Sequence, residues 1–343
     1  MKEKIKKLLF EYTRNSRIST KELGKKIRTS QQSASYLKNQ FLKNNLIEGT
    51  ATIIDAVKLG FINVLVGFNF LNLDYSIKKE IIRELKEDMM IIGIEECKEG
   101  IDLLVEFSAK NLAAFHKNHS ELIYKFDKRL KTNFVFPIIV NHEYLKKYLI
   151  KKTEDSRLIL SGDRYQKELS KNEKKVLTEL VKNTSESLVN LSITLKIPIK
   201  SVVNLKKSLE KKYIIKGYTG ILNNSKLGIN RQIILLRFSN EGVKKMDGFV
   251  QYTRTHKNII NFMKIIGNFQ VGIIVESLKE IEIIKEIRSK FPIEDYLIIK
   301  SDKIHKKRYI PELNIRKWKQ TYLNQKLVVL LILKEMNKYY WGL

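Results

Sequence analysis

The sequence has very little cysteine and proline. Its 343 residues include 1 Cys and 4 Pro. A single thiol, Cys97, forms no internal disulfide and gives no paired-Cys metal motif. This excludes the disulfide-stabilised secreted scaffolds and the Cys-based zinc sites. We expect Cys97 to be a small buried hydrophobic residue.

Long hydrophobic runs are also missing. The longest one, Leu327–Leu333, is far shorter than the roughly 20 residues that a membrane-spanning helix requires. The first residues, "MKEKIKKLLFEY", have the positive start of a signal peptide but no long apolar stretch and no small-residue cleavage site. The sequence therefore predicts a cytoplasmic protein.

Acidic residues are scarce relative to basic ones. The chain has 65 Lys and Arg against 37 Asp and Glu, a formal net charge of +28. The excess is uneven, because residues 1–50 hold 12 basic and 4 acidic residues and residues 167–220 hold 12 and 5, while residues 51–140 hold 12 and 13. Such localised positive charge points to nucleic acid as a partner, with codon bias as the alternative explanation.

Motifs of catalysis are absent from the sequence. It contains no phosphate-binding Gly-rich loop, no nucleophile elbow and no paired-Cys motif. His116 and His119 lie three residues apart on a predicted helix, but without a Cys or a carboxylate pair they predict a polar surface pair. We therefore expect no catalytic residue, no metal, no cofactor and no enzyme activity.

The sequence repeats itself at an offset of 168 residues. This offset aligns the chain up to Phe70 with residues 172–238 without a gap. "KLG" at Lys58–Gly60 matches "KLG" at Lys226–Gly228, and Phe70 matches Phe238. Apolar positions that differ in identity agree in type, so we infer a duplicated two-domain unit.

The first part of each unit has helical periodicity. In the second unit, Leu188, Leu191 and Leu195 form one apolar stripe, between two others, which predicts three short helices. A three- or four-residue turn joins the last two helices in each unit, as in a helix-turn-helix. In the first unit the third helix is predicted from Gln31 to about Lys43, with Ser30 as N-cap. The apolar pair and Gly that follow predict the first strand of a wing.

The second part of each unit alternates strands and helices in the order βαββαβ, which is the order of a ferredoxin-like sandwich. The fold class is therefore α+β, with two tandem units. The first sandwich is predicted as strand Phe61–Leu71, helix Tyr75–Asp88, strand Met89–Cys97, strand Ile101–Ser108, helix Asn111–Phe126 and strand Asn133–Val140. The second is predicted as strand Gln232–Phe238, helix Val243–Thr255, strand Ile259–Ile266, strand Phe269–Val275, helix Leu278–Lys290 and strand Tyr296–Lys300.

These patterns divide the chain into six segments. They are a first winged helix-turn-helix (1–50), a first sandwich (51–145), a linker (146–166), a second winged helix-turn-helix (167–220), a second sandwich (221–310) and a C-terminal tail helix (311–343). At the end of the second sandwich, the basic segment Lys300–Tyr309 is expected either to extend a DNA footprint or to form a solvated tail. The final apolar residues are expected to pack on a sandwich or on a partner subunit.

The second unit, a winged helix-turn-helix closing in "LEKKYIIKGYTGILNNSKLG" and followed by a βαββαβ domain, resembles the Lrp/AsnC family of transcription regulators. The first unit resembles the same family less closely, which makes the chain a tandem duplicate. The resemblance implies binding of double-stranded DNA through the third helix, pairing of the sandwiches within or between chains, and a small-molecule effector such as an amino acid. Members of this family usually have a Gly just before the wing strand, where this chain has Asn45 and Tyr213.

The resemblance places the DNA-contacting residues on the two third helices. Gln and Asn can read adenine edges, whereas Lys and Ser more often contact phosphate or sugar. Because the two helices differ at outward positions, we expect an imperfectly palindromic operator; a solvated helix face is the alternative. The predicted contact residues are Gln31, Gln32, Ser33, Ser35, Tyr36 and Lys38 in the first unit and Lys200, Ser201, Asn204 and Lys207 in the second.

The family's effector loop carries a Gly-x-x-Asp pattern between the middle strands. Here Gly100 and Asp102 stand in the first unit, and Gly267 and Gln270 in the second. They are the candidate effector-binding residues, with an ordinary tight turn as the alternative.

Two other functions share these features. Siroheme decarboxylases have the same architecture, although their chemistry calls for His or Arg, and the strands after each "KLG" hold only Arg231 and Arg237. A nonspecific architectural DNA-binding protein would have the same charge, and it differs from a regulator in the ratio of specific to nonspecific affinity.

Overall fold

The computed structural model describes residues 1–71, 74–150, 157–162 and 165–311. The predicted tail helix lies outside these residues, apart from its first position. Within the described ranges no single helix is long and apolar enough to cross a membrane. The helices Leu188–Leu195 and Ile199–Lys211 meet that length and composition only when taken together across a 109° bend.

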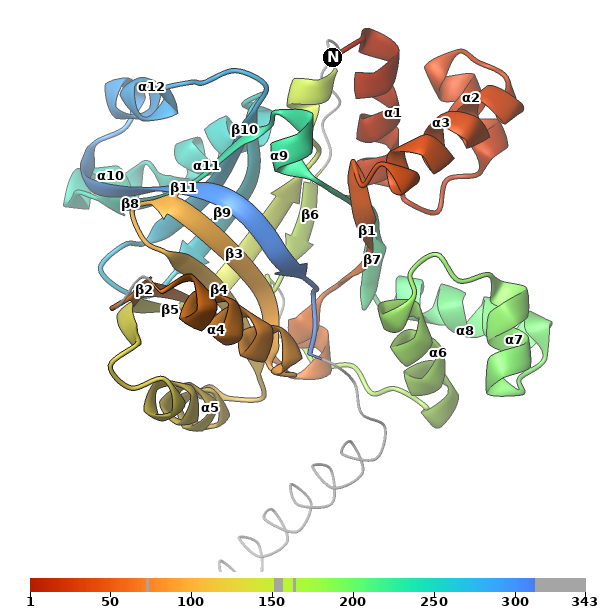
Figure 1. The fold of residues 1–343 in the computed structure, drawn as a ribbon, viewed down its shortest axis with the longest axis horizontal. Helices are drawn as coiled ribbons and strands as arrows, with labels where there is room; N and C mark the ends of the chain where they lie inside the picture. The colour runs from red at the N-terminus through yellow and green to blue at the C-terminus, as the bar shows by residue number, and fades with distance from the viewer. Residues whose placement is uncertain (72–73, 151–156, 163–164, 312–343) are drawn as a thin grey trace, which may run out of the picture.

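The described residues form two units, and each has three helices followed by a sandwich of strands and helices, as the fold class predicted (Figure 1). The first contains α1 (Glu3–Arg14), α2 (Thr20–Ile27), α3 (Gln31–Lys43), β1 (Ile47–Ile54), η1 (Ala56–Leu59), β2 (Ile62–Phe70), α4 (Tyr75–Glu87), β3 (Ile91–Glu99), β4 (Leu103–Ala109), α5 (Leu112–Lys125), β5 (Leu130–Tyr144), η2 (Lys147–Leu149) and β6 (Arg157–Leu160). The second contains α6 (Lys171–Lys182), α7 (Leu188–Leu195), α8 (Ile199–Lys211), β7 (Ile215–Leu222), α9 (Asn224–Leu227), β8 (Asn230–Phe238), α10 (Asn240–Lys244), α11 (Met246–Thr255), β9 (Ile259–Ile265), β10 (Val271–Ser277), α12 (Ile283–Lys290) and β11 (Ile293–Lys307).

Three helices form a small head at the start of each unit. We call residues 1–50 the first head and residues 167–220 the second head. Ser30 caps α3 by accepting a hydrogen bond from the Ser33 amide at 3.1 Å, as predicted. In the second head, Leu191, Val202 and Leu209 are buried in one apolar cluster, so the predicted stripes hold the helices together.

The strand after each third helix finds its partner in the other unit. β1 and β7 pair antiparallel, with Ala51 opposite Thr219. These two residues are also aligned with each other by the offset of 168 residues. A pseudo-twofold axis therefore passes through this pair, and the two heads lie on either side of it (Figure 1).

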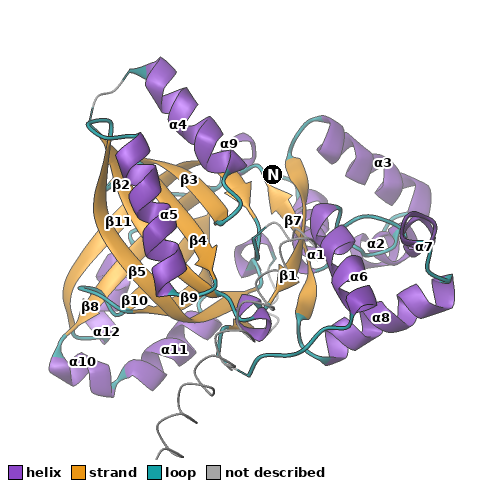
Figure 2. Cartoon of the chain, turned by 90° about the horizontal axis from the view of Figure 1, so that it is seen from below, coloured by secondary structure: helices purple, strands orange, loops and turns teal. Residues whose placement is uncertain are grey.

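The two sandwiches share one sheet. It is nine-stranded in the described residues, and all its strands except β6 form a closed ring, because β2 pairs with β5 as well as with β4. The last strand of each sandwich crosses to the other sandwich, so that β5 pairs with β9 and β11 with β3. The pairing implied for the sandwiches takes place here within one chain. The helices cover the outside of the ring (Figure 2), and Leu65, Phe136, Ile233 and Ile299 belong to the apolar cluster that joins the two halves.

Two predictions at the end of the second sandwich are wrong. The segment Lys300–Tyr309 does not form a solvated tail, whereas its predicted part in a DNA footprint stays a prediction. β11 runs on to Lys307 and pairs with β3, and His305 contacts Glu96 at 2.7 Å between Nε2 and Oε2. The predicted helix from Leu278 begins only at Ile283, because Leu278 packs against the apolar cluster of the first head instead.

Other boundaries differ less. The helix predicted over Val243–Thr255 is divided at Lys245 into α10 and α11. Residues 146–166, expected as a linker, include β6, which pairs with β5, and the buried residues of η2. Asn45 and Tyr213, which precede the strands after the third helices, have positive φ angles of 54° and 56°. The position therefore needs a left-handed conformation, which costs a Tyr more than a Gly.

Candidate functional site

The third helix of the first head presents most of its predicted DNA-contacting residues to solvent. Gln31, Gln32, Ser33 and Tyr36 are exposed, whereas Ala34 and Phe41 on the opposite face are buried. Tyr36 is 64% exposed. This face of α3 is therefore accessible to a large ligand.

Two predicted residues of the first head lie closer to its core. Ser35 and Lys38 are half-buried. The Lys38 ammonium lies 5.1 Å from the centroid of the Tyr12 ring, and burial lowers its pKa. Lys38 thus contributes less to the exposed face than its neighbours on α3.

The third helix of the second head has a more basic exposed face. Lys200, Ser201, Asn204 and Lys207 are all exposed. Lys206, in contrast, turns back to Glu210 at 2.6 Å between Nζ and Oε1. The lysines that are not needed to hold the head together therefore point outward.

The two heads are in direct contact with each other. The Arg17 guanidinium donates hydrogen bonds to the carbonyl oxygens of Thr184 and, at 3.0 Å, of Glu186. Thr219 Oγ1 donates to the Thr13 carbonyl at 2.7 Å. Thr52 Oγ1, on β1 just beyond the first head, donates to the Leu180 carbonyl at 2.6 Å. These contacts, with the β1–β7 pairing, hold α3 and α8 in one arrangement.

The four candidate effector residues lie in two equivalent turns. Asp102 accepts a hydrogen bond from the Phe70 amide at 2.8 Å, and Gln270 accepts one from the Phe238 amide at 2.9 Å. Gly100 and Gly267 have positive φ angles of 91° and 152°. The offset of 168 residues relates Asp102 to Gln270 and Phe70 to Phe238. The two side chains therefore accept a hydrogen bond from the equivalent backbone amide in each turn.

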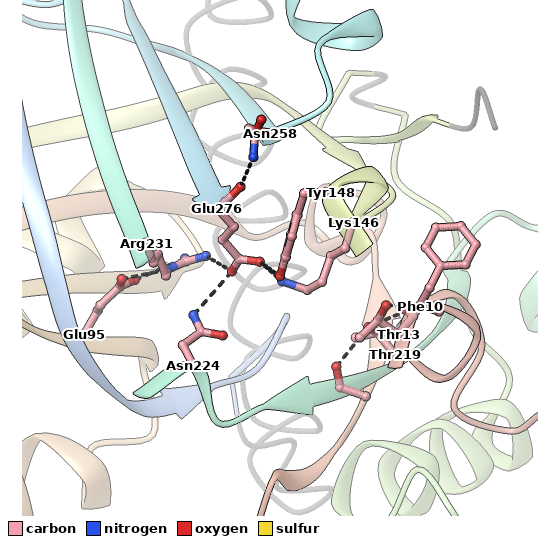
Figure 3. A network of polar contacts seen from close by, with 11 residues as sticks. Phe10, Thr13, Glu95, Lys146, Tyr148, Thr219, Asn224, Arg231, Asn258 and Glu276 are labelled. Carbon is pink, nitrogen blue, oxygen red and sulfur yellow. Dashed lines mark hydrogen bonds and ion pairs between the residues drawn. The ribbon is translucent and has the colours of Figure 1, made fainter. Parts of the chain in front are cut away.

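A buried group of charged side chains lies between the first head and the second sandwich. We call it the Glu276 cluster: Glu95, Lys146, Tyr148, Arg231 and Glu276 (Figure 3). Glu276 is 1% exposed and accepts hydrogen bonds from Lys146, from Tyr148 at 2.7 Å and from Arg231 at 3.0 Å. Arg231 also contacts Glu95 at 2.7 Å. The two cations thus face two carboxylates.

The cluster fixes the ionisation of Glu276. Burial alone would raise the pKa of this carboxyl, but the charges of Lys146 and Arg231 outweigh it and lower the pKa to about 2. A cavity of about 300 Å³, the central cavity, opens beside the cluster. Arg14, Lys146, Arg231, Lys307 and Tyr309 are among the residues that line it.

A second cavity, the side cavity, has a volume of about 610 Å³. It lies between the base of the second head, which contributes Tyr213 and Lys216, and the sheet, which contributes His142 and Lys264. His142 is 7% exposed, and its Nδ1 lies 3.4 Å from the Tyr144 hydroxyl.

His142 predicts a loss of stability in mild acid. Burial, with the nearby charges of Arg157 and Lys264, lowers its pKa from 6.5 to about 4. The native state therefore favours the neutral ring, so the stability that this preference contributes is full above pH 6.5 and is lost as the pH falls from 6.5 to 4. We expect the free energy of unfolding in urea to fall by about 2 kcal/mol from this residue between pH 7 and pH 5.

The variant His142→Gln should lack that decrease, while His116→Gln, at an exposed position, should retain it. An unchanged pH dependence in His142→Gln would refute this prediction.

No protein-family model matches the sequence, and no curated protein matches it. Solved structures match the fold. Siroheme decarboxylase NirDL in co-complex with an iron-uroporphyrin III analogue aligns with 94% of this chain and 99% of its own, at 10% identity and a TM-score of 0.57. The structure titled only as the siroheme decarboxylase NirDL gives the same coverage and TM-score at 12% identity. An AsnC family transcriptional regulator from Agrobacterium tumefaciens covers 50% of this chain and 98% of its own, at 16% identity and a TM-score of 0.34.

The expectation that the chain is not an enzyme is corrected by this comparison. Two solved structures that align with nearly the whole chain are of an enzyme, siroheme decarboxylase NirDL, so the absence of local motifs does not exclude catalysis. The expectation came from the absence of local motifs. Apart from Lys146 and Tyr148, the residues of the Glu276 cluster lie far apart in the sequence, so no spacing could reveal the group.

Proposed function

We propose that the chain binds double-stranded DNA in a sequence-specific manner and acts as a transcription regulator, using α3 and α8 as two unlike recognition helices. The observation that carries the proposal is the pseudo-twofold axis at Ala51 and Thr219, since it relates two exposed third helices within one chain. Duplex DNA has the matching local twofold symmetry. The basic excess in both heads supports contacts to phosphate.

The two helices would read different half-sites. α3 offers Gln31, Gln32 and Tyr36, whereas α8 offers Lys200, Asn204 and Lys207. The side-chain amides of Gln and Asn can make two hydrogen bonds to one adenine edge, whereas lysines favour guanine or phosphate. A single chain is thus expected to prefer an operator whose halves resemble each other without being identical. An amino-acid effector remains part of this proposal, although the turns at Asp102 and Gln270 already use those side chains.

The experiment is selection of binding sites from random duplex DNA by the full chain. We expect an imperfect palindrome, bound about 1,000-fold or more tightly than scrambled duplex at the same salt concentration. Near-equal affinity for both would instead indicate a nonspecific architectural role. Selection of a perfectly symmetric site would contradict the assignment of unlike half-sites.

A second candidate is decarboxylation of a carboxylated tetrapyrrole. It is supported by the full-length likeness to siroheme decarboxylase and by the cations that line the central cavity, Arg14, Lys307 and the paired Arg231. In such a reaction the bond between carbon and carboxylate breaks, CO₂ leaves, and the carbon takes up a proton. The cations of the cavity would hold the substrate's carboxylates.

Absorbance titration with iron-uroporphyrin III tests this candidate. A saturable change of the Soret band at one equivalent per chain, weakened in Lys307→Ala, would support it. A linear, unsaturable change, or an equal response of Lys307→Ala, would speak against a site in the central cavity. DNA binding by the same preparation provides an independent readout of the first proposal.

A further inference from the structure

The pseudo-twofold axis gives each cavity residue a counterpart in the other half of the molecule. The offset of 168 residues relates Lys216 to Glu48 and Lys264 to Glu96. For β5 and β11, the last strands of the two sandwiches, the strand pairing shows which residues correspond. Leu65 pairs with Phe136, and its counterpart Ile233 pairs with Ile299, so Phe136 corresponds to Ile299. His142 and His305 each lie six residues further along their strands. β11 bulges between Ile304 and Lys306, but each histidine lies beside one residue of the pair, His305 at Glu96 and His142 near Lys264.

In the half around His305, opposite charges are paired with one another. We call this group the closed site: Glu48, Glu96, Lys226, Lys303 and His305. Glu96 contacts His305 Nε2 at 2.7 Å and Lys78 Nζ at 2.5 Å. Glu48 accepts a hydrogen bond from Asn223 Nδ2 at 2.8 Å, and the charges of Lys303 and Lys226 act on it.

In the half around His142, both glutamates of the closed site are replaced by lysines. Lys264 takes the place of Glu96 beside the histidine, and Lys216 takes the place of Glu48. The nearest acid to Lys216 is Asp55, at 3.9 Å, and Asp55 already accepts a hydrogen bond from the Ser161 amide at 3.1 Å. We call His142, Lys216 and Lys264 the open site. Its positive charges face the side cavity.

The side cavity has the size and lining of a small-molecule site. Its volume of about 610 Å³ falls within the range of about 300 to 1,000 Å³ that is usual for ligand pockets. Apolar side chains, Val140, Ile159 and Val250, form part of its wall. The buried pair Asp55 and Lys58 and the exposed Asp247 also line it, so Lys216 and Lys264 leave an excess of positive charge. A ligand that fits must therefore combine negative charge with an apolar body.

We propose that the open site binds a small organic carboxylate with an apolar body, and that the closed site does not. The ligand's carboxylate lies among Lys216, Lys264 and His142, where it takes the place that the Glu96 carboxylate has beside His305. Its apolar part contacts Val140, Ile159 and Val250. The site is separate from the exposed faces of α3 and α8, so ligand binding here does not depend on DNA binding.

The test is a side-chain NMR titration of the full chain labelled at histidine, with phenylacetate as the probe. The His142 signal is assigned by its loss in His142→Gln. We expect a saturable shift of the His142 signal and no saturable shift of the His305 signal. Inorganic phosphate, which lacks an apolar body, should bind at least about tenfold more weakly.

The matched variant is Lys264→Glu, which copies the closed site in the open half. It should lose phenylacetate binding by about tenfold or more, because its carboxylate pairs with His142 as Glu96 pairs with His305. Lys264→Ala should show an intermediate loss. Equal binding by the parent chain and Lys264→Glu, equal shifts of His142 and His305, or equal binding of phosphate would each overturn the proposal. DNA affinity measured on the same variants should stay unchanged.

Discussion

Replacing Glu276 with Gln is expected to lower the free energy of unfolding by about 3 to 5 kcal/mol. The substitution keeps the shape of the side chain but leaves Arg231 and Lys146 with one carboxylate partner fewer in a buried environment. Removing one member of a buried ion pair costs this much because the remaining charge stays desolvated. Urea unfolding at pH 7 measures the effect.

The control is Glu241→Gln, which removes a carboxylate that is 73% exposed and lies 3.3 Å from Lys245. It should change stability by less than about 1 kcal/mol. Glu276→Gln should also remove part of the acid dependence. The pKa of Glu276 lies below its unfolded value, so its contribution is present above about pH 4.5 and is lost as the pH falls towards 2. A loss no larger than that of Glu241→Gln would show that the cluster is not a stabilising element.

Reversing the charge of α8 is expected to produce the largest loss of DNA affinity. The double variant Lys200→Glu/Lys207→Glu changes two exposed side chains and leaves the buried residues Val202 and Leu209 in place. It disables one of two linked heads, so the advantage of binding both half-sites together, about 100-fold to 10,000-fold, should disappear. Fluorescence anisotropy on the selected operator at fixed salt measures this change.

A matched control carries the same change in charge away from the heads. Lys117→Glu/Lys131→Glu alters two exposed lysines on the first sandwich and should reduce affinity much less. If both double variants lose affinity equally, net charge rather than the face of α8 determines binding. Circular dichroism of each variant verifies that the heads remain folded.

The sequence predicted the individual units better than their assembly. The helical apolar stripes, one with Leu191 and another with Val202 and Leu209, predicted the head, because a helix in a small domain must bury one face. The strand ends that join the two sandwiches were missed. The β11 residues beyond Lys300 are polar and basic, and only their pairing with β3 explains why such a segment is a strand.

The candidate site could be predicted only in part. The exposed positions of α3 and α8 follow from helical periodicity and the position of the turns, so most of them could be named in advance. The Glu276 cluster could not. Its members come from β3, η2 and the segment before it, β8 and β10, and the equivalent positions in the first unit are Asn63 for Arg231 and Ser108 for Glu276. A comparison of the repeats gives no sign of a shared charged site.

The pseudo-twofold axis at Ala51 and Thr219 also affects how this molecule can evolve. In a dimer of identical chains, every mutation appears twice and alters both halves together. Here each mutation appears once, so the exposed face of one head can change while that of the other stays the same. The same freedom extends to the sandwiches, where Glu96 and Lys264 already occupy equivalent positions with opposite charge. Because the two halves belong to one chain, each can mutate separately. Dilution cannot dissociate them, as it can dissociate a dimer.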